Sequence, residues 1–237
     1  LYGLDTPRWR ADSGRPLIIT PGQGITPEDI DTGERSLWRY RKAFALDIAT
    51  PIALGEGCTP LRAVSWGGAS GEAASPLFKL EWFSPTGSFK DRGASVMLSA
   101  LRQQGVRAVL EDSSGNGGAA VAAYAAAGGL DATIFAPEST SPAKLVQARA
   151  YGARVELVPG PREASQRAAI DATELGGYGG GRDPRPAFYA SHNWQAYFLE
   201  GTKTLAYELW EDLGFRAPDN IIVPVGAGSS LLGLAIG

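Results

Sequence analysis

Hydrophobic positions follow two alternating spacings from residue 88 onward. Short apolar runs containing β-branched residues predict strands at 108–111, 132–135 and 154–158. Apolar residues at helical spacing predict helices at 88–104, 118–127, 142–151 and 161–175. Strands that alternate with helices of this length indicate βαβ units, which build parallel sheets with helices on their faces.

The remaining segments are less regular. The first fifty residues are rich in Pro, Arg and Trp, and they predict an irregular arm with a short helix at 35–46. A short strand and turn are expected at 63–71, and a strand at 77–82. A glycine-rich loop at 176–186 is interpreted as a boundary or a lid. After it the pattern predicts a long helix at 199–213, an apolar strand at 220–225 and the start of a last helix.

Composition narrows the class of protein. The 237 residues are 44% hydrophobic and 20% charged, as in a globular protein of one large or two modest domains. The net charge of −3 argues against a nucleic-acid partner, which would need a basic face. The uncharged stretches 113–130 and 221–237 are interrupted by Gly, Ser or Pro, so we expect no membrane span. We expect a cytoplasmic protein whose chain is C-terminally incomplete, since it ends just after an apolar run.

The chain has one histidine and one cysteine. These counts exclude a His-rich metal site, a zinc ribbon and a disulfide framework, and no metal is expected. A Ser–His–Asp triad could rest only on His192, which we interpret as a loop or pocket-rim residue. Cys58 is interpreted as a packed thiol.

The segment Ser84–Ser95, SPTGSFKDRGAS, places a lysine at the start of a helix. Ser88 is a suitable N-cap. Asp91 follows three residues later, where its carboxylate can accept a hydrogen bond from the backbone N–H of Ser88. Lys90 then lies beside the positive end of the helix dipole, which favours a neutral amine. A neutral lysine amine can form a Schiff base with an aldehyde cofactor. The alternative is a solvated first-turn lysine.

A polar loop joins the strand at 108–111 to an Ala-rich helix. Its residues present hydroxyl groups and backbone N–H groups at a helix N-terminus: Ser113, Ser114, Gly115, Asn116 and Gly117. Such an arrangement favours binding of a carboxylate. A capped strand-to-helix loop is the simpler alternative, although it needs only one of these residues.

A second small-residue loop follows the apolar strand at 220–225. It comprises Gly226, Ala227, Gly228, Ser229 and Ser230, and a nest of amides of this kind binds phosphate. A dinucleotide site in a nicotinamide oxidoreductase is the alternative. The dinucleotide-binding motif GxGxxG would begin at Gly226 and Gly228, but its third glycine is missing, because position 231 is Leu. A lysine, a carboxylate loop and a phosphate loop together indicate pyridoxal 5′-phosphate (PLP).

Five motifs in order resemble the tryptophan-synthase-β-like superfamily of PLP enzymes (fold type II), and within it the threonine synthases. They are EGCTPL at 56–61, PTGSFKDRG at 85–93, SSGNGG at 113–118, LEGTKTLAYEL at 199–209 and VPVGAGSSLLG at 223–233. The resemblance implies an α/β fold of two three-layer αβα domains with mainly parallel sheets. Residues 1–91 plus 195–237 would form the large cofactor-binding domain, and residues 92–194 a small mobile substrate domain.

The resemblance also implies roles for single residues. Lys90 would bind PLP as a Schiff base and act as the catalytic base and acid, with Phe89 near the cofactor ring. Asn116 would hydrogen-bond the ring oxygen. The substrate α-carboxylate would bind Ser113, Ser114, Gly115 and Gly117. The cofactor phosphate would bind Gly226, Ala227, Gly228, Ser229 and Ser230.

The implied activity is a lyase that eliminates the phosphate of O-phosphohomoserine and adds water to give threonine, in a homodimer. Phe198 precedes Leu199, where threonine synthases commonly have an arginine that grips the substrate phosphate. Four other basic residues could substitute for it: Lys144, Arg149, Arg162 and Lys203. The alternatives are a serine/threonine dehydratase or diaminopropionate-lyase-like β-eliminase, and a non-catalytic relative that binds a metabolite or a partner.

Overall fold

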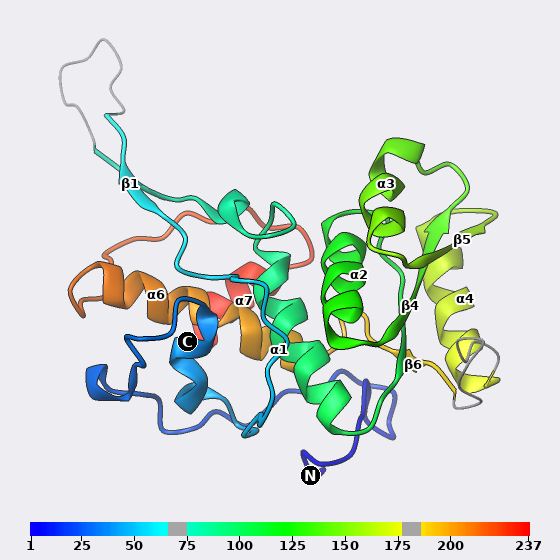
Figure 1. The fold of residues 1–237 in the computed structure, drawn as a ribbon, viewed down its shortest axis with the longest axis horizontal. Coiled ribbons are helices and arrows are strands. Elements are labelled where there is room, and N and C mark those ends of the chain that lie inside the picture. The colour runs from blue at the N-terminus through cyan, green and yellow to red at the C-terminus, as the bar shows by residue number, and fades with distance from the viewer. Residues whose placement is uncertain (66–74, 177–185) are drawn as a thin grey trace.

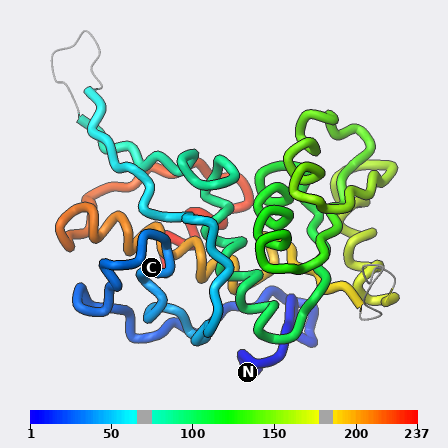
Figure 2. The backbone as a smooth tube through the Cα atoms, in the orientation of Figure 1, coloured from blue at the N-terminus to red at the C-terminus, as the bar shows by residue number. Residues whose placement is uncertain are grey.

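The structure is a computed structural model that describes residues 1–65, 75–176 and 186–237. Figure 1 shows a sheet flanked by helices and, beside it, a second unit built around helices. The N-terminal arm crosses beneath the sheet, whereas the last residue lies in the helical unit (Figure 2). The arm is anchored by Trp9, whose ring packs edge-on against Tyr189, with the ring centroids 4.9 Å apart.

The sheet has four parallel strands in the order β5-β4-β3-β6. They are β3 (Ala108–Glu111), β4 (Asp131–Pro137), β5 (Arg154–Val158) and β6 (Phe188–Tyr189). Helices α2 (Asn116–Gly128) and α3 (Pro142–Ala150) cover one face, and α4 (Arg162–Glu174) covers the other (Figure 1). The α/β class with a parallel sheet is therefore confirmed. This sheet lies wholly within the predicted substrate domain, residues 92–194.

Helix α2 follows from its sequence. Its middle is almost entirely Ala and Gly, and every residue from Gly117 to Ala125 is buried. Side chains this small let neighbouring elements approach closely on all sides. The helix ends at Gly129, whose φ of 69° is the left-handed conformation that favours glycine at a helix C-terminus.

The second unit is organised around α1 (Lys90–Gln103), which packs against α2 and α5. The remaining helices are α5 (Ala196–Thr202), α6 (Thr204–Asp212) and α7 (Ser229–Ile236). Strands β1 (Leu61–Ala63) and β2 (Leu77–Lys79) form an antiparallel pair. The described part of this unit also contains three 3₁₀ helices: η1 (Pro27–Asp29), η2 (Leu37–Ala43) and η3 (Glu81–Phe83).

The predicted strand at 220–225 is wrong. The segment has no secondary structure, and the side chain of Ile222 is 99% exposed. A strand needs a neighbour for its ladder, and Pro224 has no N–H to donate to one. The segment is apolar, but an apolar composition does not supply a strand to pair with.

Other boundaries shift by a few residues. The helix expected at 35–46 is the shorter 3₁₀ helix η2, and the strand expected at 77–82 ends at Lys79 before η3. The long helix expected at 199–213 begins earlier and is divided at Lys203 into α5 and α6. The short strand and turn expected at 63–71 and the loop expected at 176–186 lie largely outside the described residues. Within the described ranges, no helix is long and apolar enough to cross a membrane.

Candidate active site

Lys90 and the glycine-rich turn before α7 meet although 139 positions separate them. The Lys90 Nζ atom donates a hydrogen bond to Ser229 Oγ at 3.3 Å. The same nitrogen lies 4.0 Å from the centroid of the Phe89 ring and 6.0 Å from that of Phe198. The amine therefore points into the space between α1 and the N-terminus of α7.

The surroundings of Lys90 disfavour its charged form. Burial lowers the pKa of Lys90 below its ordinary value, and the Glu111 carboxylate opposes this change. The amine is partly buried and has a neutral hydroxyl as its hydrogen-bond partner. A lowered pKa makes more of the neutral, nucleophilic amine available at a given pH.

The start of α1 differs in detail from the predicted cap. The backbone N–H of Lys90 donates to Ser88 Oγ at 3.3 Å, but the expected hydrogen bond from the Ser88 backbone N–H to the Asp91 carboxylate is replaced by others. Asp91 instead accepts from the backbone N–H of Thr86 at 2.7 Å and from the Thr86 hydroxyl. Burial raises the pKa of Asp91 to about 6, although both hydrogen bonds from Thr86 lower it. The Asp91 carboxylate therefore holds the loop at Thr86, two residues before Ser88, rather than at Ser88 itself.

The loop 113–117 joins β3 to α2 at the carboxyl edge of the sheet. Ser113 is buried and accepts a 3.4 Å hydrogen bond from Gly115 N–H, whereas Asn116 is exposed at the start of α2. A Cβ added at Gly118 would lie 2.0 Å from the Ser113 carbonyl oxygen. Only glycine at position 118 therefore permits this tight return of the chain.

The loop 226–230 has the features of an anion cradle. Gly228 has a φ of 93° and forms the N-cap of α7, while Ser229 and Ser230 are buried. A Cβ added at Gly226 or Gly228 would meet no described atom within 4 Å, so open space lies beside the backbone. Helix-terminal amides, two hydroxyls and a nearby lysine fit a phosphorylated aldehyde.

The structure adds two residues that the motif analysis did not assign to the site. His192 follows β6 and is buried beside the carboxyl end of β3, where its Nδ1 atom lies 2.8 Å from Glu111 Oε1. Its backbone N–H donates to Glu111 Oε2 at 3.0 Å. The His192 ring packs edge-on against Phe198, with centroids 5.7 Å apart. The sequence signal was the glutamate at the end of a buried strand, but its partner lies 81 residues away.

The four basic substitutes for the arginine lie in different places. Arg162 donates to Asp112 Oδ2 at 3.1 Å, beside the start of the 113–117 loop. Lys203 is buried and bonded to Glu200 and to the Ala43 carbonyl, so its charge is already satisfied. Lys144 and Arg149 are exposed on α3. The ring that packs against Phe198 is the imidazole of His192, not one of these four side chains.

A buried ionic network supports the helix that carries Lys90. Arg92 is fully buried and pairs with Glu208 at 2.9 Å and with Glu81 at 2.8 Å. Glu208 also accepts from the backbone N–H groups of Cys58 and Thr59 at 2.9 and 2.8 Å. The network therefore joins three separate motifs of the sequence. The interpretation of Cys58 as a packed thiol is wrong, because the residue is exposed, with a φ of 49°.

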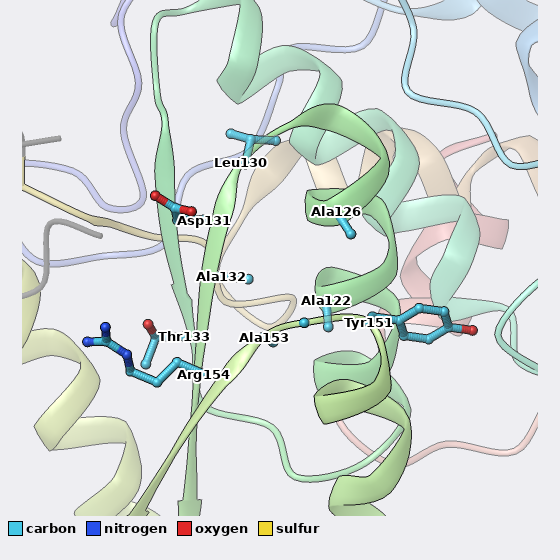
Figure 3. Close-up of a pocket in the computed structure, with 10 residues that line it drawn as sticks. Ala122, Ala126, Leu130, Asp131, Ala132, Thr133, Tyr151, Ala153 and Arg154 are labelled. Carbon is cyan, nitrogen blue, oxygen red and sulfur yellow. The ribbon is translucent and has the colours of Figure 1, made fainter. Parts of the chain in front are cut away.

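A separate hollow lies between α2 and the amino ends of β4 and β5 (Figure 3). Its lining includes Ala122, Ala126 and Arg154. Ligands of open α/β sheets bind outside the carboxyl ends of the strands, which is the edge where the 113–117 loop lies. This hollow is therefore distinct from the candidate active site.

Comparison with known proteins defines the class. The family described as "Pyridoxal-phosphate dependent enzyme" matches residues 52–237, which include Lys90 and both loops. The chain belongs to this family, and PLP is the cofactor of the family.

Among curated proteins, the chain is similar to threonine synthases. It is 32% identical to that of Methanocaldococcus jannaschii over 209 residues, which is 87% of this chain and 49% of the relative. It is 35% identical to that of Mycobacterium tuberculosis over 184 residues, which is 77% of this chain and 48% of the relative. The chain thus spans about half the length of these relatives.

Solved structures agree on the fold. A hydrogen sulfide-producing enzyme from Fusobacterium nucleatum superposes with a TM-score of 0.65 at 26% identity, covering 76% of this chain and 57% of that one. Maize serine racemase gives 0.62 at 29% identity, covering 75% and 51%. These neighbours share the fold type II architecture that the motifs predicted.

Proposed function

We propose that this protein is a threonine-synthase-like lyase, which eliminates the phosphate of O-phosphohomoserine and adds water to form threonine. The observation that carries the proposal is the contact between Lys90 and Ser229, because it brings the two most specific motifs together. The similarity to threonine synthases supports the choice of substrate.

The described residues fit PLP at this site. Lys90 would hold the aldehyde carbon, with Phe89 beside the ring and Asn116 donating to the ring oxygen. Five residues at the start of α7 would bind the cofactor phosphate: Gly226, Ala227, Gly228, Ser229 and Ser230. Bound in this way, PLP supplies an electron sink that stabilises negative charge on the α-carbon of an amino acid.

The chain's own residues would then perform the proton transfers. The substrate α-carboxylate would bind Ser113, Ser114 and the amides of Gly115 and Gly117, which orients the α-hydrogen. Lys90 Nζ would remove that proton, and burial favours this role because it lowers the lysine pKa. Phosphate leaves from the γ-carbon, and the hydroxyl of one water is added at the β-carbon. The balance is O-phosphohomoserine plus water giving threonine plus phosphate.

Product analysis tests the proposal. The protein with PLP should release inorganic phosphate and threonine in equal amounts from O-phosphohomoserine. Lys90→Ala should lose both this activity and the visible absorbance of lysine-bound PLP. Ammonia and a keto acid formed from serine or threonine, without phosphate release from O-phosphohomoserine, would instead identify a β-eliminating dehydratase. A protein that binds no PLP would be a non-catalytic relative.

The dehydratase is the second candidate because of Phe198. A buried phenyl ring cannot replace the guanidinium group that would grip a phosphate. A dehydratase, or a diaminopropionate-lyase-like enzyme, needs no second phosphate site. The homodimer and the cytoplasmic location stay predictions; sedimentation of the purified protein tests the former.

A further inference from the structure

We infer that His192, paired with Glu111, binds the phosphate group of the substrate in the place that an arginine would otherwise take. The inference rests on the proposed function, because only a phosphorylated substrate needs a second phosphate site. It begins from Phe198, which leaves the site without the expected cation.

The space at position 198 is fixed by packing. Phe198 is fully buried, and a Cβ added at Gly93 would lie 2.5 Å from its ring. The ring therefore occupies a slot that the glycine in α1 leaves open. Because an apolar ring fills this space, a cation at this wall has to come from a residue other than Phe198.

His192 lies against this wall. Its ring contacts Phe198 on one side, and a Cβ added at Gly117 would lie 2.7 Å from its Nδ1 atom. Gly117 belongs to the proposed carboxylate loop, and Lys90 Nζ lies 6.0 Å from the centroid of the same Phe198 ring. The imidazole therefore lies beside the loop that would hold the α-carboxylate, and it flanks the same Phe198 ring as the amine that would remove the α-proton.

The hydrogen bonding of His192 leaves one nitrogen for a ligand. Nδ1 is 2.8 Å from the Glu111 carboxylate, so it carries a proton in this contact. Among the described residues, Nε2 has no hydrogen-bond partner, and the residue keeps 7% of its surface exposed. When the ring is an imidazolium, its Nε2–H group can donate a hydrogen bond to a phosphate oxygen. Glu111 is fully buried, and its negative charge compensates that of an imidazolium.

Arg162 is the competing cation at this edge of the sheet. It pairs with Asp112, the residue after Glu111, so their side chains leave the strand on opposite faces. Asp112 is bonded to Tyr189 and Ser191, and Tyr189 belongs to the apolar cluster beneath α4. Arg162 therefore lies on the α4 face, away from Phe198, and serves as the matched control.

Because the chain has a single histidine, its imidazole gives one unambiguous set of NMR signals. The experiment titrates the PLP-loaded protein with inorganic phosphate, so that the cofactor phosphate already fills the 226–230 loop. We expect a saturable shift of the imidazole signals. Glu111→Gln should weaken phosphate binding about 10-fold or more, as for loss of a charge-assisted interaction, and Arg162→Gln should leave it within about 2-fold.

Signals that do not move with phosphate, or that lose their response in Arg162→Gln, would overturn the inference. His192→Gln gives a second measurement: the KM for O-phosphohomoserine should rise about 10-fold or more, with a smaller change in kcat and unchanged PLP absorbance. If threonine forms with an unchanged KM in this variant, the inference fails while the proposed function stands. If the unmodified protein forms no threonine but phosphate still shifts its imidazole signals, the proposed function fails and the phosphate site remains.

Discussion

The properties of Lys90 come from neighbours that are distant in the sequence. Its position at a helix start could be read from the sequence, because PTGSFKDRG contains the turn and the first helical residues. Its hydrogen bond to Ser229 could not, because that contact depends on how α7 packs against α5. His192 shows the same limit, since the glutamate that holds it lies 81 positions earlier. The sequence therefore indicated which side chains could carry chemistry, whereas their hydrogen-bond partners became known only from the fold.

Lys90 should react with aldehydes faster than the other lysines. Burial lowers the pKa of Lys90, so more of its neutral amine is available near neutral pH. Lys144, which is exposed on α3, serves as the comparison. Treatment with PLP and borohydride, followed by peptide mass mapping, should place the pyridoxyl group on Lys90. The preference for Lys90 should be largest near neutral pH and should shrink at high pH, where lysine amines in general are neutral. Equal labelling of both lysines at neutral pH would contradict the prediction.

Glu208 should contribute strongly to stability. Burial opposes its ionisation, yet Arg92 and Lys79 outweigh burial and lower the pKa of Glu208 to about 2. The stabilisation is therefore fully present above the unfolded pKa and is lost as the pH falls toward about 2. Glu208→Gln should lower the free energy of unfolding by about 3–5 kcal/mol near pH 7, because it leaves Arg92 buried and underpaired. Urea denaturation measures this.

Asp47→Asn is the control for Glu208→Gln. The Asp47 side chain is 96% exposed, and its ion pair with Arg41 is long at 3.8 Å. The free energy of unfolding should not change measurably. Equal losses in the two variants would refute the structural importance of the buried network.

At the scale of elements, the central βαβ pattern was predictable because each strand and helix satisfies a local rule. β3, β4 and β5 are short apolar runs, and the helices between them show regular spacing. The segment 220–225 obeys the same apolar rule, yet no strand among the described residues pairs with it. Pairing is not a local property, so composition alone could not decide that case.

The contact between α1 and α5 depends on close backbone approach. A Cβ added at Gly201 would lie 2.1 Å from the Arg92 carbonyl oxygen, which belongs to α1 and cannot move aside cheaply. Gly201→Ala should therefore lower the free energy of unfolding by about 3 kcal/mol or more, despite the better helix propensity of alanine. Gly22→Ala, where a new Cβ would meet no described atom, should have little effect. Thermal denaturation compares the two variants, and equal melting temperatures would contradict this view of the helix contact.

At the scale of the whole molecule, the proposed site draws on three separate parts of the chain. Lys90 lies on α1, the carboxylate loop begins α2, and the phosphate loop begins α7. A ligand that joins these elements binds the folded state only. PLP at about 100 times its dissociation constant should therefore stabilise the protein by about 2.7 kcal/mol. Calorimetry should show this gain, and Lys90→Ala should show much less; equal gains would place PLP elsewhere.

The slot shared by Gly93 and Phe198 also constrains attempts to redesign specificity. The two positions are coupled, because the Phe198 ring occupies the space that a side chain at position 93 would need. Installing an arginine at 198 alone would leave a hole against α1 and strand a cation in an apolar wall. Laboratory redesign at this wall should therefore treat Gly93 and Phe198 as a pair, because the Phe198 ring is what fills the space beside that glycine in this chain.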